Sequence, residues 1–357
     1  IKQTIQSAQN QAGGTGVQQT QDMTSIVSDI IVSSNTETGS KMIEELNNSS
    51  TDTENDLSLQ VISAISEKDT TKLNTLSENN KEQIDTLTQS AVKNAGSSQE
   101  SADLIAKVVA NASDDFANQI IGEVTKNSID ENQALSAKVM KSIVETTPDK
   151  VENLNDENKD NLISQTIEAA KNQAEGTSSD ELDLSNTIAE IVTNSDTGTA
   201  AKVLESLEEA SNDSDSKLSL SVVSNLTKQE NYEEKMEILS VTSSVVDQSI
   251  NTLIEKAVEN ASSEEDLELV TDIVENSKGS LGDKIVNSAN KSEESKKKIT
   301  EIIVKVVEKN PEKAVEIIEK NKNTNAVLET VKSKIEKGEA VSTDDFEEVF
   351  KTNVSPN

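Results

Sequence analysis

The sequence predicts an all-α protein made of tandem helical repeats that stack as an elongated α-solenoid or rod. The first observation is an aliphatic pair that recurs four times, each time with Lys or Gln eleven residues after its first member and two aliphatic residues behind that. The copies are Ile30-Ile31 with Lys41-Met42-Ile43, Val108-Val109 with Gln119-Ile120-Ile121, Ile191-Val192 with Lys202-Val203-Leu204, and Ile273-Val274 with Lys284-Ile285-Val286. The second is another set with the same period of about 80 residues, at Val61, Val139, Val222 and Ile302.

The third observation is helical spacing of apolar residues within each unit. The second unit predicts four helices at about 102–111, 115–126, 132–146 and 149–175, because apolar residues three and four apart share one helix face. Those residues are Leu104, Val108, Val109, Phe116, Ile120, Ile121, Val124, Leu135, Val139, Met140 and Ile143. The alternation expected of strands between Gly-rich turns is missing.

Helix starts are marked at equivalent positions of two units. Thr147-Pro148-Asp149 and Asn310-Pro311-Glu312 each place a capping side chain before Pro and an acid behind it. Val307-Glu308-Lys309-Asn310 also echoes Val274-Glu275-Asn276, with an amphipathic helix after each. This half-period indicates that the elementary unit is a helix hairpin of about 35–42 residues, so that each unit holds two hairpins.

The repeats divide the chain into six parts. We expect residues 1–22 to be a partial repeat, the last helix of a preceding unit, followed by repeats at 23–100, 101–181, 182–265 and 266–340, with 341–357 opening a further repeat or forming a cap. The segment Ile1–Ala12 resembles an ordinary internal helix, which favours a fragment of a longer array over a chain with natural caps.

The charge of the chain limits the classes of partner that it can bind. Net charge is −33, from 33 basic and 66 acidic residues, and the apolar fraction is 32%. Such a composition also fits disorder, but aliphatic pairs kept in register over four copies argue against it. The negative charge disfavours nucleic acid and anionic membranes, and Lys296-Lys297-Lys298 is better read as a solvated helix start because acids surround it. No apolar run approaches the roughly 18 residues of a membrane span.

The missing residue types argue against an enzyme. The chain has no Cys, no His and no Trp, and all 33 basic residues are Lys. Nucleophilic triads and imidazole acid–base chemistry are therefore excluded, and no Arg can clamp a phosphate. The glycines form no phosphate-binding loop. We thus expect no catalytic residues, no cofactor-binding or metal-site residues, and no small-molecule substrate.

Calcium is the one ligand question that the acids raise. Asp52-Thr53-Glu54, Asp114-Asp115 and Asp213-Ser214-Asp215 offer hard oxygen atoms in expected loops, but none follows the EF-hand pattern. Acidic helix starts or solvated loops are the preferred interpretation. No cofactor is expected, and any Ca²⁺ binding would be weak and would relieve like-charge repulsion.

The recurrent Lys41, Lys202 and Lys284, with Gln119 in the second unit, admit two interpretations. They could contact acids on a neighbouring helix, or they could be surface side chains whose methylene stems cover the core. We favour the second.

Two functions remain. The favoured one is a structural segment of a long, acidic, repetitive protein that acts as a spacer, stalk, filament or coat, extracellular or at a bacterial cell surface, and that associates with itself or with neighbouring repeats. The alternative is a cytoplasmic solenoid scaffold whose concave face binds a protein. The scarcity of aromatic residues and the lack of Arg make this alternative less favoured, because these residues anchor most protein interfaces.

Overall fold

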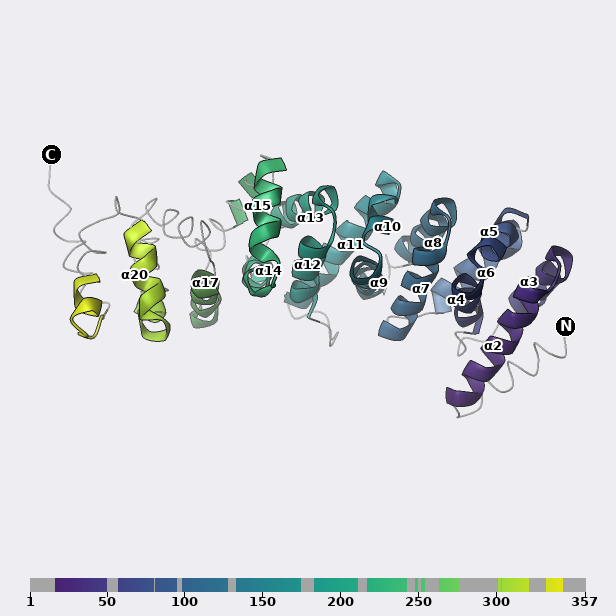
Figure 1. Cartoon of the computed structure of the whole chain (residues 1–357), viewed down its shortest axis with the longest axis horizontal. Helices are drawn as coiled ribbons and strands as arrows, with labels where there is room; N and C mark the ends of the chain where they lie inside the picture. The colour runs from purple at the N-terminus through teal and green to yellow at the C-terminus, as the bar shows by residue number, and fades with distance from the viewer. Residues whose placement is uncertain are drawn as a thin grey trace. The chain divides into compact units, whose positions relative to one another are not determined.

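The computed structural model describes residues 17–49, 57–79, 81–94, 98–127, 133–174, 183–210, 217–242, 248–249, 252–253, 263–276, 301–302, 304–320 and 332–342. Every regular element in these ranges is a helix (Figure 1), which confirms the predicted all-α class. The chain divides into two compact units, unit 1 at Ile1–Val203 and unit 2 at Leu204–Asn357. Each is described by itself.

Unit 1 contains two rows of helices. The A row consists of α2 (Val17–Ser33), α4 (Leu57–Lys68), α7 (Gln99–Asn111), α9 (Gln133–Thr146) and α12 (Leu184–Asn194). The B row consists of α3 (Thr36–Ser49), α5 (Thr70–Asn79), α6 (Lys81–Asn94), α8 (Asp114–Asn127), α10 (Asp149–Glu152) and α11 (Asp156–Ala174). Each A helix and the B helices that follow it form one hairpin.

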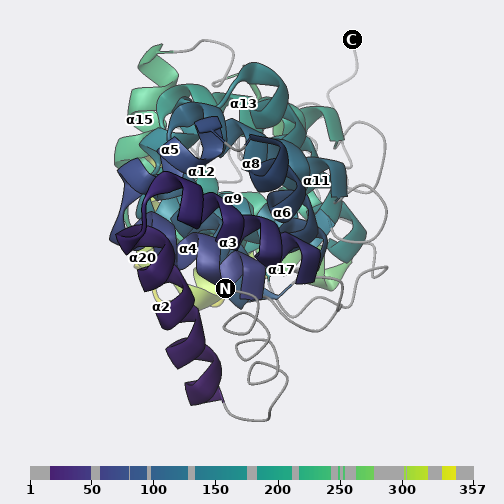
Figure 2. The same cartoon turned by 90° about the vertical axis from the view of Figure 1, so that its right-hand side faces the viewer.

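The two rows stack in chain order. In the A row α2 packs on α4, α4 on α7, α7 on α9 and α9 on α12, while in the B row α3 packs on α6, α6 on α8 and α8 on α11. In Figure 2 the first hairpin, α2 with α3, faces the viewer. Unit 1 is therefore an α-solenoid of successive hairpins.

Unit 2 repeats the same relations where it is described. Its helices are α14 (Lys217–Lys228), α15 (Tyr232–Thr242), α17 (Glu264–Asn276) and α20 (Pro311–Lys320), and α13 (Thr197–Ala210) crosses the division between the units. Helix α14 packs on α15 and on α17, as an A helix does on its own B helix and on the next A helix.

The core confirms the packing role of the recurrent aliphatic residues. Those in the described ranges are buried except Ile30, which is partly exposed. Lys284-Ile285-Val286 lies outside the described residues. The half-period is also confirmed, because the residues at 30, 108, 191 and 273 lie on α2, α7, α12 and α17, and those at 61, 139 and 222 lie on the alternating helices α4, α9 and α14.

Small hydroxyl side chains are buried on the A-row helices of unit 1 and on α14 and α17 of unit 2. The buried ones are Thr24, Ser28, Ser58, Ser63, Ser66, Ser101, Ser136, Ser142, Thr187, Thr193, Ser219, Ser224, Thr227 and Thr271. Several donate to a carbonyl of the preceding turn, as the hydroxyls of Thr187 (3.0 Å to the carbonyl oxygen of Asp183) and Thr271 (2.7 Å to that of Leu267) do. This bond satisfies the hydroxyl within its own helix, so the polar group can be buried between helices.

The prediction of one helix at 149–175 is wrong. The structure has α10 and α11 there, separated by residues 153–155. Asn155 Oδ1 accepts a hydrogen bond from the Asn158 amide at 2.8 Å and starts α11, while Leu154 is buried in the break. The first unit shows the same division into α5 and α6, so in these two units the second hairpin has two B helices and the predicted four helices become five.

Three predicted repeat boundaries fall inside helices. Those after residues 22, 100 and 265 lie within α2, α7 and α17, because these helices begin with polar turns that precede the apolar pattern. The boundary after residue 181 precedes the Asp183 cap of α12. The segments 1–16 and 343–357 lie outside the described residues.

Candidate functional site at the hairpin boundaries

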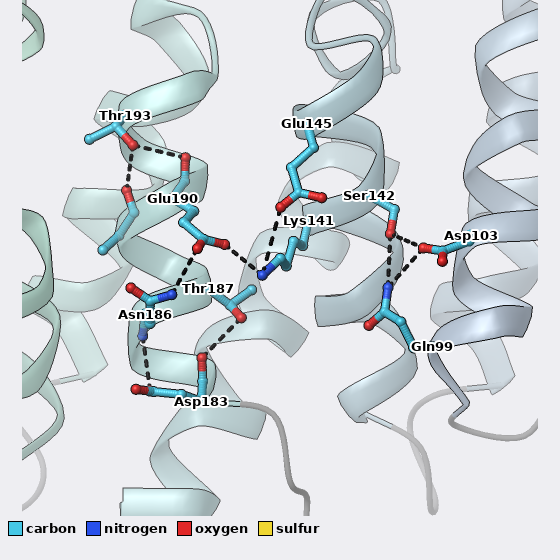
Figure 3. A network of polar contacts seen from close by, with 11 residues as sticks. Gln99, Asp103, Lys141, Ser142, Glu145, Asp183, Asn186, Thr187, Glu190 and Thr193 are labelled. Carbon is cyan, nitrogen blue, oxygen red and sulfur yellow. Dashed lines mark hydrogen bonds and ion pairs between the residues drawn. The ribbon is translucent and has the colours of Figure 1, made fainter. Parts of the chain in front are cut away.

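The richest polar contacts within the described part of unit 1 join successive hairpins. Helix α9 is tied to both of its A-row neighbours (Figure 3). Toward α12, Lys141 Nζ lies 2.7 Å from Glu190 Oε2 and 3.7 Å from Glu145 Oε1 of its own helix. Toward α7, the Ser142 hydroxyl donates to Asp103 Oδ1 at 2.7 Å, and Gln99 Nε2 donates to the Ser142 oxygen at 3.1 Å.

The Lys141 contact keeps its ammonium charged. Burial disfavours that charge, but hydrogen bonding and attraction from Glu190, supported by Glu145, outweigh it and raise the pKa of Lys141 above its ordinary value. Glu190 is itself oriented, because Asn186 Nδ2 donates to Glu190 Oε1 at 2.8 Å and the Asn186 amide is held by the Asp183 cap at 3.0 Å.

Other A-row boundaries carry lysine–acid contacts too. Lys68 Nζ on α4 lies 2.8 Å from Asp29 Oδ1 on α2, and it also donates to the Ser28 hydroxyl at 3.0 Å. Lys107 Nζ on α7 lies 3.0 Å from Glu67 Oε1 on α4.

Unit 2 repeats the pattern at Asp272 on α17. Its carboxylate oxygens lie 3.6 Å from Lys228 Nζ of α14 and 3.2 Å from Lys309 Nζ of the described helical segment 304–309. The hydrogen bond to Asp272, opposed by desolvation and aided by further acids, raises the pKa of Lys309.

Two further lysines, which we call the capping lysines, contact main-chain carbonyls. Lys72 Nζ on α5 donates to the carbonyl oxygen of Ser34 at 2.6 Å, and Lys150 Nζ on α10 donates to that of Ala112 at 2.7 Å. Each carbonyl follows the end of the previous A helix, where carbonyls lack intrahelical donors and the helix dipole favours a cation.

The sequence carried a signal for the capping lysines that we missed. Each occupies the third position after a helix-start residue, in Asp69-Thr70-Thr71-Lys72 and Thr147-Pro148-Asp149-Lys150. Asn310-Pro311-Glu312-Lys313 has the same form, and there Lys313 Nζ lies 3.3 Å from Glu316 Oε2. The start residue was interpreted as a cap, whereas the lysine behind it was left unassigned.

The preferred surface interpretation of the recurrent lysines is wrong for two copies. Lys202 Nζ lies 2.7 Å from Asp160 Oδ1 of α11, and Gln119 Nε2 donates to Asp85 Oδ1 of α6 at 2.6 Å. Lys41 instead pairs within α3, at 2.7 Å from Glu37 Oε1. These side chains reach across the hairpin boundary because they lie on the B-helix side that faces the previous hairpin, and Lys284 is outside the described residues.

Amides join the B row around α8. Asn158 Nδ2 on α11 donates to the main-chain oxygen of Asn118 at 2.7 Å, and Gln165 Nε2 donates to that of Thr125 at 2.7 Å. A Cβ at Gly122 would meet Asn158 Oδ1 at 3.4 Å, an ordinary van der Waals distance, so this approach does not depend on glycine.

The start of α13 holds a perturbed carboxylate. Asp196 accepts hydrogen bonds from the Thr199 amide at 2.9 Å and from the Thr199 hydroxyl. Burial opposes the charge, but these bonds, with one from the Gly198 amide, outweigh it and hold the pKa of Asp196 below its ordinary value.

The calcium candidates divide between the described and undescribed chain. Asp114 and Asp115 form the first turn of α8, where Asp114 Oδ1 lies 3.2 Å from Lys150 Nζ, so the expected acidic helix start is what the structure has. Asp52-Thr53-Glu54 and Asp213-Ser214-Asp215 lie outside the described residues, as does Lys296-Lys297-Lys298. Across the described ranges, no three acidic side chains gather in a group suited to a metal ion, and no helix there is long and apolar enough to span a bilayer.

No protein-family model and no curated protein matches the chain. Among solved structures it is similar to an engineered protein, with 11% identity over 98% of this chain and 99% of that chain and a TM-score of 0.29. It is also similar to PUF-8 in complex with PBE-RNA, with 14% identity over 83% and 94% and a TM-score of 0.31. A computationally designed self-assembling cyclic homooligomer gives 13% identity over 81% and 99%, with a TM-score of 0.15. At these TM-scores the similarities carry no argument about function.

Proposed function

We propose that the chain is a segment of a non-catalytic repeat scaffold that acts as a spacer, stalk, filament or coat, extracellular or at a bacterial cell surface. The observation that carries this proposal is the stacking in unit 1, where each A helix packs on the A helix before it and on the one after it. An array of this kind can be lengthened by adding hairpins, without changing how the existing ones pack. A spacer or stalk needs that property.

The chemistry of the boundaries supports a structural role. The described lysines at these boundaries bind carboxylates or helix-end carbonyls, so their ammonium groups are engaged in contacts between hairpins. The sequence adds no His, Cys or Arg that could do other chemistry.

Two composition features support a place outside the cell. A net charge of −33 keeps a long array soluble and repels polyanions. The absence of cysteine removes the residue most sensitive to oxidants.

Small-angle X-ray scattering of the full chain tests the spacer role. If stacking continues through both units, seven A helices about 10 Å apart give a longest dimension of roughly 70 Å or more. A globule of this length would have a radius of gyration of about 20 Å and a diameter of about 50 Å. A longest dimension near 50 Å at every concentration would refute the proposal, whereas growth of particle length with concentration would indicate the filament form.

A pull-down with the full chain from bacterial cytosol and from a cell-surface extract provides the second test. The spacer role predicts no stoichiometric cytosolic partner. Recovery of one such partner at a fixed ratio would favour the cytoplasmic scaffold and overturn the proposal.

A further inference from the structure

Two kinds of boundary alternate along unit 1. At the first kind, lysine donors reach main-chain carbonyls of the previous hairpin, in addition to side-chain pairs such as Lys68 with Asp29 and Lys150 with Asp114. Lys72 reaches Ser34 between the α2–α3 hairpin and the α4–α6 hairpin, and Lys150 reaches Ala112 between the α7–α8 hairpin and the α9–α11 hairpin. The capping lysines therefore join hairpins one and two, and hairpins three and four.

Amide side chains strengthen the boundary between α8 and α11. Asn158 and Gln165 each donate at 2.7 Å to a carbonyl of α8, and the Asn155 amide donates to Asn118 Oδ1 at 2.8 Å. A main-chain carbonyl holds its position only while its helix is folded. Unfolding of either hairpin therefore breaks these bonds, which couples the stability of the two.

The second kind of boundary lies between α4 and α7 and between α9 and α12. Here the ion pairs join side chains. Lys107 and Glu67 lie 3.0 Å apart with about half of each side chain exposed (53% and 49%), and Lys141 and Glu190 lie 2.7 Å apart with about a fifth of each exposed (19% and 22%). Lys202 and Asp160 form a similar half-exposed pair. Water and salt compete with the two half-exposed pairs, so these couple the hairpins weakly, whereas the more buried Lys141–Glu190 pair holds α12 to α9 more firmly.

Main-chain amides contribute at these second boundaries as well. The Ser113 amide donates to Asn74 Oδ1 at 3.1 Å, and the Leu184 amide donates to Gln173 Oε1 at 2.9 Å. Both acceptors are rotatable side chains, and both donors lie at or just before the start of a helix. Such contacts can be given up without unwinding a helix.

We infer that unit 1 is built of two-hairpin blocks, α2–α6 and α7–α11, separated by seams at which the array opens first. The seams recur once per period of about 80 residues. An array built this way can bend or lengthen at its seams while both hairpins of each block stay folded. This conformational property goes beyond the proposed spacer role and holds wherever the protein is located.

Hydrogen–deuterium exchange of the full chain tests the inference, with Lys150→Met, Lys107→Met and the control Lys126→Met. In the wild type, α7–α11 should show one common slow opening that differs from that of α2–α6. Lys150→Met should raise exchange in α7–α9 roughly tenfold, from the loss of a hydrogen bond to a charged group, and should separate α7–α8 from α9–α11. Lys107→Met should change either block less than about threefold.

The control and a second block keep the test decisive. Lys126 is 72% exposed and pairs with Glu123 three residues away in α8, so Lys126→Met removes no contact between hairpins and should leave the pattern of block openings unchanged. Lys72→Met should make the α2–α3 and α4–α6 hairpins exchange at separate rates, as Lys150→Met does for α7–α8 and α9–α11. Lys150→Arg, which keeps the charged donor, should show the wild-type exchange pattern. A seam variant as damaging as Lys150→Met, or one common opening across all described helices up to α12, would overturn the inference.

Discussion

Ile191→Asp tests whether the array is modular. Ile191 lies on α12 and is 0% exposed. The substitution loses the burial of an isoleucine, about 1.5–3 kcal/mol, and buries a carboxylate without a partner, which costs several kcal/mol more. The sum of about 5 kcal/mol or more reaches the lower end of the total stability of a typical domain. The α12 hairpin should therefore unfold.

The damage should stop close to the mutated helix. Helix α12 packs on α9 and α11 in unit 1, so these helices lose a neighbour, whereas α2, α3 and α4 lose none. Hydrogen exchange measured peptide by peptide on the full chain should show α12 unprotected, α9 and α11 weakened, and α2–α4 unchanged.

A matched control makes the result specific. Ile26 on α2 is 45% exposed, so Ile26→Asp adds the same charge without burying it and should leave exchange unchanged. If Ile191→Asp instead removes protection from exchange along the whole chain, including α2–α4, modular stability is refuted.

Three further changes test single contacts through urea unfolding. Asp196→Ala removes the hydrogen bonds that Thr199 donates, and should cost about 0.5–2 kcal/mol at pH 7. Because the folded pKa is lowered, that difference should shrink as pH falls from about 4 through the folded pKa; a difference constant with pH would contradict it. Gly122→Ala should stabilise the chain by about 0.5–1 kcal/mol, because alanine favours a helix interior more than glycine does. A destabilised variant would show that α8 and α11 cannot accommodate the added methyl group. Lys202→Met should cost up to about 1 kcal/mol, lost in 1 M salt, while Lys41→Met should have no measurable effect; equal losses would mean that contact across the boundary is immaterial.

The helical class and its period could be predicted because they depend on local patterns. Val108 and Val109 recur with Ile191 and Val192 at the spacing of one helix face, and all four side chains are buried. Apolar periodicity reports burial directly, since each buried position selects an aliphatic residue whatever its partner is. Helix ends were harder to predict, because the first turns of α2 and α7 are largely polar and lack the apolar periodicity.

The boundary contacts were less accessible to sequence reasoning because they depend on which helix lies opposite. Lys202 and Lys41 occupy the same repeat position, yet one meets Asp160 on α11 and the other Glu37 on its own helix. A lysine reaching a carbonyl, as Lys150 does, leaves no trace in the acceptor residue, here Ala112. Only the spacing from the helix start marked it.

The buried hydroxyls of the A row affect the heat capacity of unfolding. Serine and threonine occupy sites such as Ser63, Ser142 and Thr187, where other helical cores place leucine or phenylalanine. Exposure of apolar surface on unfolding raises the heat capacity, and exposure of polar surface lowers it. The heat-capacity change of unfolding per residue should therefore lie below the usual value of about 12–15 cal/mol/K. We therefore expect a flatter stability curve, in which the free energy of unfolding changes less with temperature than in a helical protein with a fully apolar core.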